Sequence, residues 1–140
     1  MPVTIKDTDS GQGNIILCQG HFTGEEYLDA LKVHLSQDAA TFRRYRYSLF
    51  DISEITGLNF SNPELEEVVQ LCLDATRINP DPFVAMVASK DLTFGLARMF
   101  ETMLAQTDWE TMVFRTRPDA EQWLREEVKK KFGLDALTFK

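Results

Sequence analysis

Six apolar residues follow one another without interruption in the stretch Phe83-Val84-Ala85-Met86-Val87-Ala88. The stretch shows no alternation of apolar and polar side chains, and it is too short for a typical helix. Such a run is typical of a strand covered on both faces, as the central strands of parallel sheets are. The segment 79–82, Asn-Pro-Asp-Pro, comes directly before it and ends any preceding helix. The stretch therefore predicts a central strand in a layered protein.

Strand and helix patterns alternate on both sides of this strand. Further strands are predicted at 14–20, 45–52 and 111–114, where β-branched and aromatic residues lie between polar segments. Apolar residues at helical spacing predict helices over about 24–38, 62–78, 91–106 and 117–132. Alternation of this kind implies right-handed crossovers and parallel strands.

The sequence thus predicts an α/β fold, with a mostly parallel sheet of four to five strands layered with about four helices. Residues 3–6 are the expected hairpin partner of the strand at 14–20, so this N-terminal strand is expected to be antiparallel. Residues 1–140 contain no repeat and no low-complexity linker. We therefore expect a single domain, which at this length buries roughly two-thirds of its unfolded surface.

The composition excludes several classes of partner. The chain has 22 acidic and 15 basic side chains, a formal net charge of −7. An acidic chain of this kind argues against nucleic acids and anionic membrane surfaces as partners. It has no signal-like N-terminus and no apolar stretch of membrane-spanning length, so we expect a cytoplasmic protein without membrane insertion. Cys18 and Cys72 lie in apolar patterns, which predicts reduced, buried thiols.

The sequence lacks the common motifs that indicate catalysis or cofactor binding. It contains no phosphate-binding glycine signature, no zinc-ligand spacing and no nucleophile elbow. His21 and His34 are interpreted as solvent-facing or locally bonded histidines. We therefore predict no catalytic residue, no metal and no cofactor. The rival hypothesis is an enzyme that uses Asp51, Ser53 or Arg98 at the carboxyl ends of parallel strands, where α/β proteins bind ligands.

Two groups of residues remain as candidate binding features. The first lies on the predicted helix 91–106, where Phe94, Met99 and Met103 are candidates to line an apolar pocket with Arg98 facing an anionic group. The alternative is that these apolar residues form core, on a stripe with Leu92 and Leu96, and that Arg98 pairs with Glu101. The second feature is the basic island 43–47, Arg-Arg-Tyr-Arg-Tyr, whose arginines are interpreted as partners in local ion pairs.

The segment Leu49-Phe50-Asp51-Ile52-Ser53 and its continuation to Ser61 resembles the corresponding segment of STAS domains. In that family a strand ends in an Asp-Leu-Ser-like turn, and an Asp-Ser-Ser-Gly stretch then caps the next helix. The resemblance places the family's regulatory, phosphorylatable serine on Ser61. Asn59, Phe60 and Asn62 depart from the family pattern, and Ser61 also suits a helix cap paired with Glu64.

Residues 83–88, 94–101 and 113–124 more closely resemble the bacterial SpoIIAA-like proteins, which are related to STAS and Sec14 lipid-binding domains. This resemblance covers nearly the whole chain and implies a non-catalytic domain that binds a protein partner or a small lipophilic, anionic ligand such as a lipid. An alternative that it leaves open is a phosphorylation-switched antagonist of an anti-sigma factor. Leu134, Leu137 and Phe139 are expected to dock either across a homodimer or on the protomer's own sheet.

Overall fold

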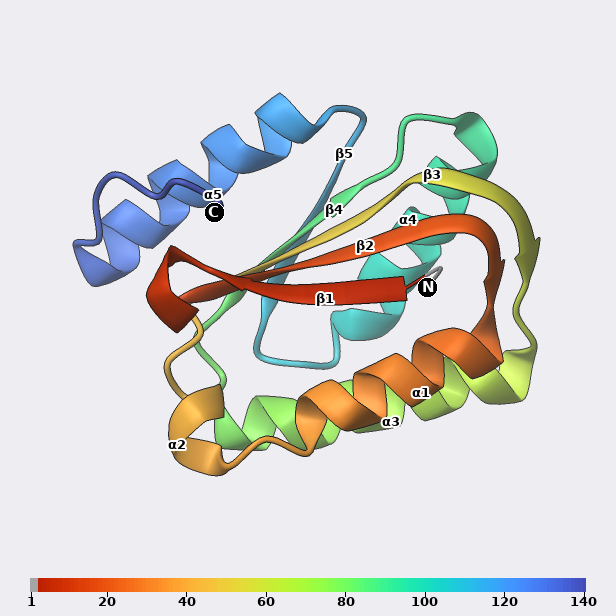
Figure 1. Ribbon diagram of the computed structural model, residues 1–140, viewed down its shortest axis with the longest axis horizontal. Helices are drawn as coiled ribbons and strands as arrows, with labels where there is room; N and C mark the ends of the chain where they lie inside the picture. Colours follow the sequence, from red (N-terminus) through yellow and green to blue (C-terminus); the bar gives the residue numbers. More distant parts are fainter. Residues whose placement is uncertain (1–2) are drawn as a thin grey trace.

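A computed structural model describes residues 3–140 of the chain, in the form of one sheet with helices on both faces (Figure 1). The elements in chain order are β1 (Val3–Thr8), the 3-10 turn η1 (Asp9–Gly11), β2 (Gly13–Thr23), α1 (Gly24–Leu35), α2 (Ala39–Phe42), β3 (Tyr47–Asn59), α3 (Asn62–Ile78), β4 (Phe83–Val87), α4 (Asp91–Leu104), β5 (Glu110–Phe114) and α5 (Arg117–Phe132).

The five strands lie in the sheet in the order in which they occur in the chain, β1-β2-β3-β4-β5. The β1–β2 pair is antiparallel, and every other neighbouring pair is parallel. The predicted α/β class, the mostly parallel sheet and the antiparallel N-terminal strand are therefore confirmed. All five residues of β4 are buried, as the unbroken apolar run predicted.

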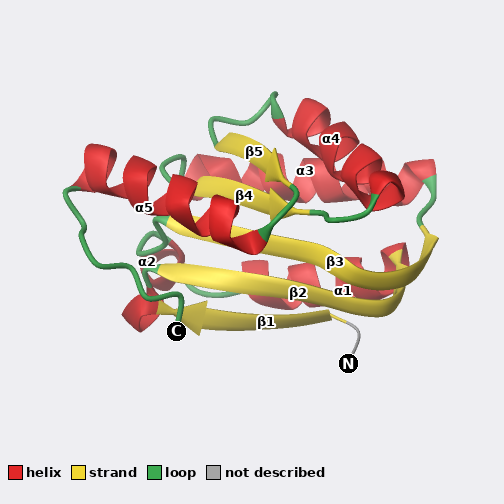
Figure 2. Ribbon diagram, turned by 90° about the horizontal axis from the view of Figure 1, so that it is seen from above, coloured by secondary structure: helices red, strands yellow, loops and turns green. Residues whose placement is uncertain are grey.

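The strand order decides how the helices are distributed between the two faces of the sheet. Each parallel connection moves one strand in the same direction, so right-handed crossovers carry α1, α3 and α4 to the same face (Figure 2). Their buried residues form one core with that face of the sheet, including Tyr27, Phe50, Val68 and Phe100. We call this the three-helix face.

The other face of the sheet is covered by α5 and by the C-terminal residues 133–140, and we call it the α5 face. Leu124 and Val128 of α5 and Leu137 and Phe139 of the tail form a second core there. Leu134 packs against this core as a half-buried side chain. The tail therefore docks on the protomer's own sheet, which is the second of the two arrangements expected from the sequence.

Hydrogen bonds to one carboxylate fix the tail in place. Asp9 accepts hydrogen bonds from the Thr138 backbone and hydroxyl, both at 2.8 Å, and from the Phe139 backbone at 3.0 Å. Tyr47 donates to the same carboxylate at 2.6 Å, and its ring meets the Phe139 ring edge to face. Burial alone would raise the pKa of Asp9, but these hydrogen bonds lower it below its ordinary value.

Gly13 makes the position of Tyr47 possible. A Cβ atom at residue 13 would lie 1.9 Å from Cζ of the Tyr47 ring, so only glycine allows the ring to cross β2 at this point. The Tyr47 hydroxyl thereby reaches Asp9 on η1 as well as Thr8 at the end of β1. Glycine in β2 is thus required by packing of a side chain from β3.

Three sequence-based expectations differ from the structure. The strand expected to end at residue 52 continues to Asn59, because β2 runs alongside it as far as Thr23. The strand expected at 14–20 likewise continues to Thr23, so His21 lies in β2. The helix expected over 24–38 ends at Leu35, and a separate short helix, α2, follows with Asp38 as its N-cap.

The buried face of α4 also differs from the predicted one. Leu92, expected on the core stripe, is 72% exposed, and Met99 is 41% exposed. The helix instead buries five residues that include threonine and alanine: Thr93, Leu96, Ala97, Phe100 and Leu104. Spacing alone did not identify the face, because apolar residues occur around most of this helix.

Candidate ligand-binding site

An apolar cavity of about 80 Å³ lies on the three-helix face, at the end where β2, β3 and β4 begin. Its floor is formed by inward-facing residues of these three strands, and its walls come from α1, α3, α4 and the α2 segment. The lining residues are mostly aliphatic and aromatic, and they include Ile16, Phe50, Met86, Leu31 and Leu104. Concave, mainly apolar sites with a few polar groups are the usual form of small-molecule sites.

Two polar side chains lie on the floor of the cavity. Ser48 of β3 donates a hydrogen bond to Asn14 Oδ1 of β2 at 2.7 Å, and both residues line the cavity. The pairing register of the two strands places them directly opposite each other. Within residues 3–140 the amide nitrogen of Asn14 donates no hydrogen bond. It is therefore the floor's free hydrogen-bond donor toward a bound molecule.

The mouth of the cavity carries a chain of hydrogen bonds that begins at His34. The Gln37 amide nitrogen donates to the His34 carbonyl oxygen at 2.9 Å and lies 3.2 Å from both His34 Nδ1 and the Tyr45 hydroxyl. Tyr45 in turn donates to Asp7 at 2.5 Å, and burial followed by this bond raises the pKa of Tyr45 to about 12. An amide nitrogen can only donate, so its approach to Nδ1 favours the neutral imidazole that carries its proton on Nε2.

Burial lowers the pKa of His34 below its ordinary value of 6.5, although the charge of Asp7 acts in the opposite direction. His34 is therefore neutral at pH 7. A neutral ring with its proton on Nε2 can donate to an oxygen of a bound molecule without bringing a charge into an apolar site. The structure confirms the expectation that His34 is locally bonded, and it adds that the ring lines the cavity.

The walls at the mouth are held by a buried asparagine. Asn79, the C-cap of α3, donates from its amide to the backbone oxygens of Phe42 and Tyr45, each at 3.0 Å. Trp109 donates from its indole to the Asn79 backbone oxygen at 2.7 Å and itself lines the cavity. These bonds tie α2, α3 and the segment before β5 together, so the cavity is built from fixed elements.

The residues predicted to bind a ligand on helix 91–106 lie elsewhere. Within the described chain, none of Phe94, Arg98, Met99 and Met103 lines the cavity, although Phe100 and Leu104 of the same helix do. Arg98 is exposed and pairs with Glu101 at 3.5 Å, which is the alternative that the sequence offered. Phe94 and Met103 are half-buried and pack against the core of the three-helix face.

Ser61 is the N-cap of α3. Its hydroxyl accepts from the Glu64 backbone at 3.3 Å, and the Glu64 carboxylate accepts from the Ser61 backbone at 2.8 Å. The capping box expected from the sequence is therefore present. The hydroxyl is exposed, and a phosphate added to it would displace the cap and lie beside the Glu64 carboxylate.

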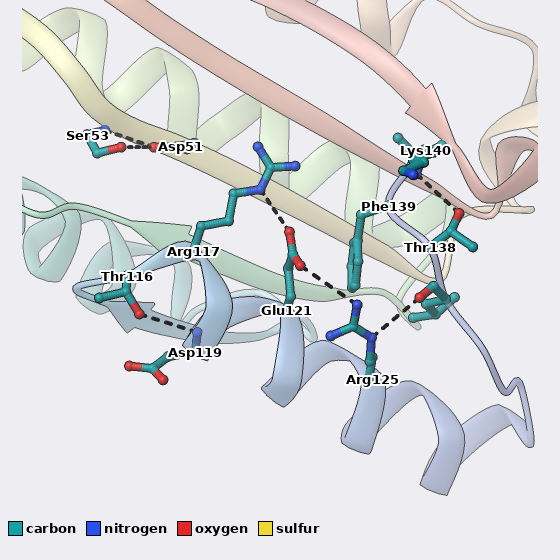
Figure 3. Close-up of polar contacts among 12 residues, drawn as sticks. Asp51, Ser53, Thr116, Arg117, Asp119, Glu121, Arg125, Thr138, Phe139 and Lys140 are labelled. Atoms are coloured by element: carbon teal, nitrogen blue, oxygen red, sulfur yellow. Dashed lines mark hydrogen bonds and ion pairs between the residues drawn. The ribbon is translucent and has the colours of Figure 1, made fainter.

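The carboxyl ends of the parallel strands do not assemble the residues of the enzyme hypothesis. Asp51 accepts hydrogen bonds from the backbone and hydroxyl of Ser53 on β3 (Figure 3). Asp51 shares the α5 face with Leu49 by strand alternation, whereas Arg98 lies on α4, on the opposite side of the sheet. Because the strand order never reverses, the sheet also lacks the switch point at which such proteins form a ligand crevice.

The two cysteines are buried, and the described residues hold neither a metal-binding cluster nor a helix that could span a membrane. Burial raises the pKa of both Cys18 and Cys72 to about 12, so both remain protonated, as the predicted buried cysteines should. Residues 3–140 contain no group of three or more side chains arranged to hold a metal ion. No helix in this part of the chain has the length and hydropathy needed to cross a membrane.

Comparison with known proteins places the fold. No protein-family profile and no curated protein matches the sequence significantly. Among solved structures, the chain is similar to an uncharacterized protein of the DUF3478 family from Shewanella loihica PV-4, described as having a SpoIIAA-like fold. The TM-score is 0.53 at 20% sequence identity, and the match covers 87% of this chain and 91% of that chain. The fold is SpoIIAA-like.

This likeness confirms the SpoIIAA-like fold expected from the sequence resemblance. The expectation had rested on residues 83–88, 94–101 and 113–124, which lie in β4, in α4, and in β5 and α5 of this fold. At 20% identity the likeness carries the architecture and no function. The cavity was not foreseen, because its lining comes from positions as distant as Asn14 and Trp109. The one local signal was His34 in the predicted helix 24–38, which was interpreted as solvent-facing or locally bonded and lines the cavity.

Proposed function

We propose that this protein is a non-catalytic binding domain and that its cavity on the three-helix face receives a small, mostly apolar molecule with one hydrogen-bonding group. The observation that carries this proposal is the combination of an apolar cavity with three polar side chains at its floor and mouth, Asn14, Ser48 and His34. A packing defect in a core would be expected to have only apolar walls, because buried polar atoms cost free energy unless they are paired.

The volume limits the size of the molecule. Each water needs about 10–15 Å³ of such space, so a cavity of about 80 Å³ corresponds to roughly five to eight waters. Apolar cavities of about 150 Å³ bind benzene. This cavity has about half that volume, so a small ring compound such as phenol fits only with part of the molecule in the mouth beside His34. A lipid chain is much larger than the closed part of the cavity, so the volume favours a small ring compound over a lipid.

The polar groups suggest how such a molecule would lie. Its ring would contact Phe50, Met86 and Leu104 on the closed side. A hydroxyl group at the mouth would accept a hydrogen bond from His34 Nε2, which remains neutral at pH 7. The nucleophile-type side chains Cys72 and Ser48 line the cavity, but burial raises the pKa of Cys72 to about 12 and the Ser48 hydroxyl donates to Asn14. Neither is activated by a charged partner, which supports binding without catalysis.

Phenol provides a direct test. Titration of the protein with phenol, followed by two-dimensional NMR of labelled methyl groups, should shift the signals of Leu31 and Val84, which line the cavity. Substitution of Val84 by isoleucine adds one methylene to the cavity and should weaken phenol binding. Val87 lies three residues further along β4, on the α5 face, and Val87→Ile should leave phenol binding unchanged.

Two outcomes would contradict the proposal. The first is an absence of shifts at Leu31 and Val84 with phenol and with toluene at millimolar concentration. The second is equal weakening by Val84→Ile and Val87→Ile, which would place the effect in general stability. Toluene has the same ring without the hydroxyl, so stronger binding of phenol than of toluene would support the assigned role of His34.

A further inference from the structure

A second pocket, of about 310 Å³, lies on the surface at the same end of the sheet and involves the basic island predicted from the sequence. Its lining residues are Gln12, Arg44, Arg46, Phe132 and Leu134, and we call it the basic pocket. Arg44 and Arg46 lie between α2 and β3, whereas Phe132 and Leu134 lie at the end of α5 and the start of the tail. The pocket thus joins cationic side chains to an apolar wall.

The arginines of the basic island have no carboxylate partners. Among residues 3–140, none of the ion pairs includes Arg43, Arg44 or Arg46. The interpretation of these residues as local ion-pair partners is therefore wrong. In a chain with net charge −7, acidic side chains are abundant, yet within residues 3–140 none lies within ion-pair distance of these three arginines. The positive charge of the basic pocket is left uncompensated.

Backbone carbonyl groups hold the two guanidinium groups in position. Arg44 Nη2 donates to the Ser10 carbonyl at 2.7 Å. Arg46 Nη1 donates to the carbonyls of Arg43, at 2.8 Å, and Tyr45, at 3.2 Å. Carbonyl groups fix the side chains without neutralising them, and the remaining N–H groups of both have no partner in the described chain. Such preformed forks match the oxygens of a carboxylate or phosphate.

An aromatic ring lies beside these forks. The Arg46 guanidinium lies 4.9 Å from the centroid of the Phe132 ring, a distance typical of cation–π contact. Lys131 also approaches this ring, but its ammonium group is paired with Asp81 at 3.9 Å and donates to the Asp81 carbonyl. Arg44 and Arg46 are therefore the groups left for an external anion, with Phe132 and Leu134 as the apolar surface next to it.

We propose that the basic pocket binds a small organic anion, in which a carboxylate or phosphate group contacts Arg44 and Arg46 and an apolar body lies against Phe132 and Leu134. The site is independent of the cavity, because Phe132 packs on the α5 face and the cavity lies on the other face. A ligand of this kind satisfies the free N–H groups and the exposed apolar wall together, which neither chloride nor a neutral compound does.

Titration with benzoate and with phenyl phosphate tests the proposal and distinguishes the two anionic groups. Binding is followed by NMR of the arginine Nε–Hε signals and by calorimetry. At least one of the two compounds should bind and shift the signals of Arg44 and Arg46. Benzyl alcohol, which lacks the charge, and inorganic phosphate, which lacks the ring, should each bind more weakly by about tenfold or more.

Variants of the same basic island supply matched controls. Arg44→Gln and Arg46→Gln should each weaken binding by about tenfold or more, whereas Arg43→Gln, outside the pocket, should leave it unchanged. Arg46→Lys keeps the charge and most of the packing, so a loss in this variant reports the guanidinium geometry even if Arg46→Gln unfolds. Absence of binding for both aromatic anions, or an equal loss in Arg43→Gln, would overturn the proposal. So would tighter binding of a single-stranded oligonucleotide than of either anion.

Discussion

The two faces of the sheet are covered by different means, and the apolar cavity lies on the three-helix face. On the three-helix face, α1, α3 and α4 each connect two parallel strands and lie where the crossovers place them. On the α5 face, α5 connects no strands, and the tail completes the cover through Leu137 and Phe139. The connecting helices leave the cavity of about 80 Å³ near the strand starts, whereas the pockets at Phe132 and Leu134 and at Arg125 and Leu137, beside α5 and the tail, lie on the surface.

The difference follows from what each segment is free to do. A crossover helix must join the end of one strand to the start of the next, so its position is constrained at both ends. A terminal segment is constrained at one end only and can adjust until its side chains fill the space. The comparison teaches that the cavity lies on the face whose helices are constrained at both ends, and that the α5 face is closed by a terminal segment that packs against it.

The largest expected effect tests whether the tail closes the α5 face. Phe139→Ala removes a buried ring. Its centroid lies 5.2 Å from that of the Tyr47 ring and 4.9 Å from the guanidinium carbon of Arg125 (Figure 3). Such truncations cost about 3–5 kcal/mol, so we expect a loss of about 3 kcal/mol in the free energy of unfolding, measured by urea denaturation. Leu92→Ala, at a residue 72% exposed, should change it by less than about 0.5 kcal/mol. Equal small losses would mean that the tail does not close this face.

The second prediction compares the packing of the two faces within one strand. Val84 borders the cavity, so Val84→Ile should be neutral or should stabilise the protein by up to about 0.8 kcal/mol. Val87 is 1% exposed in the core of the α5 face, where an added methylene should cost about 1–3 kcal/mol. Urea denaturation of both variants measures the difference. Equal costs at the two positions would show that the faces are packed alike.

The third prediction concerns the start of α3 on the three-helix face. Ser61→Ala removes the side-chain cap and should cost about 1 kcal/mol in the free energy of unfolding. Ser61→Asp should remain within a few tenths of a kcal/mol of the parent, because aspartate caps helices as well as serine does. Thermal and urea denaturation of both variants measure these changes in stability. A large loss in Ser61→Asp would contradict the capping role and would make a negative group at this site a switch.

The smallest effect is the pH dependence of stability due to His34. Burial holds the pKa of His34 in the folded protein below 6.5, so the unfolded chain takes up its proton first as the pH falls. The free energy of unfolding is therefore unaffected by His34 above pH 6.5. It decreases below that pH until His34 is also protonated in the folded state. His34→Gln should remove this decrease when urea midpoints are compared between pH 7.5 and pH 5.5. His21→Gln is the matched control, and loss of the decrease in that variant would contradict the assignment.

Much of the local structure could be predicted from short segments of sequence. The capping box at Ser61, the caps at Thr23 and Thr116, and the left-handed Gly133 that ends α5 all occur where the residues indicate them. Each is decided by contacts between residues three or four apart. The buried strand at residues 83–88 could equally be predicted, because both of its faces are covered and its whole sequence is therefore apolar.

The length of β3, in contrast, could not be predicted from its own sequence. Beyond Asp51 the strand pairs with β2 alone, since β4 ends at Val87. An edge of this kind tolerates the polar residues Ser53, Glu54 and Thr56, and the sequence there reads as a turn. The partner strand that extends β3 lies more than thirty residues away, so no local pattern contains the information.

The sequence by itself determined the α/β class, the mostly parallel sheet, the starts of the four long helices and the burial of both cysteines. The tertiary structure decided which face of α4 is buried, where the tail docks, and where the cavity and the basic pocket lie. The physical reason is the range of the interactions. Periodicity and capping act within a few residues, whereas the cavity joins Asn14 to Trp109 and the basic pocket joins Arg44 to Phe132, contacts that exist only after the sheet has brought those segments together.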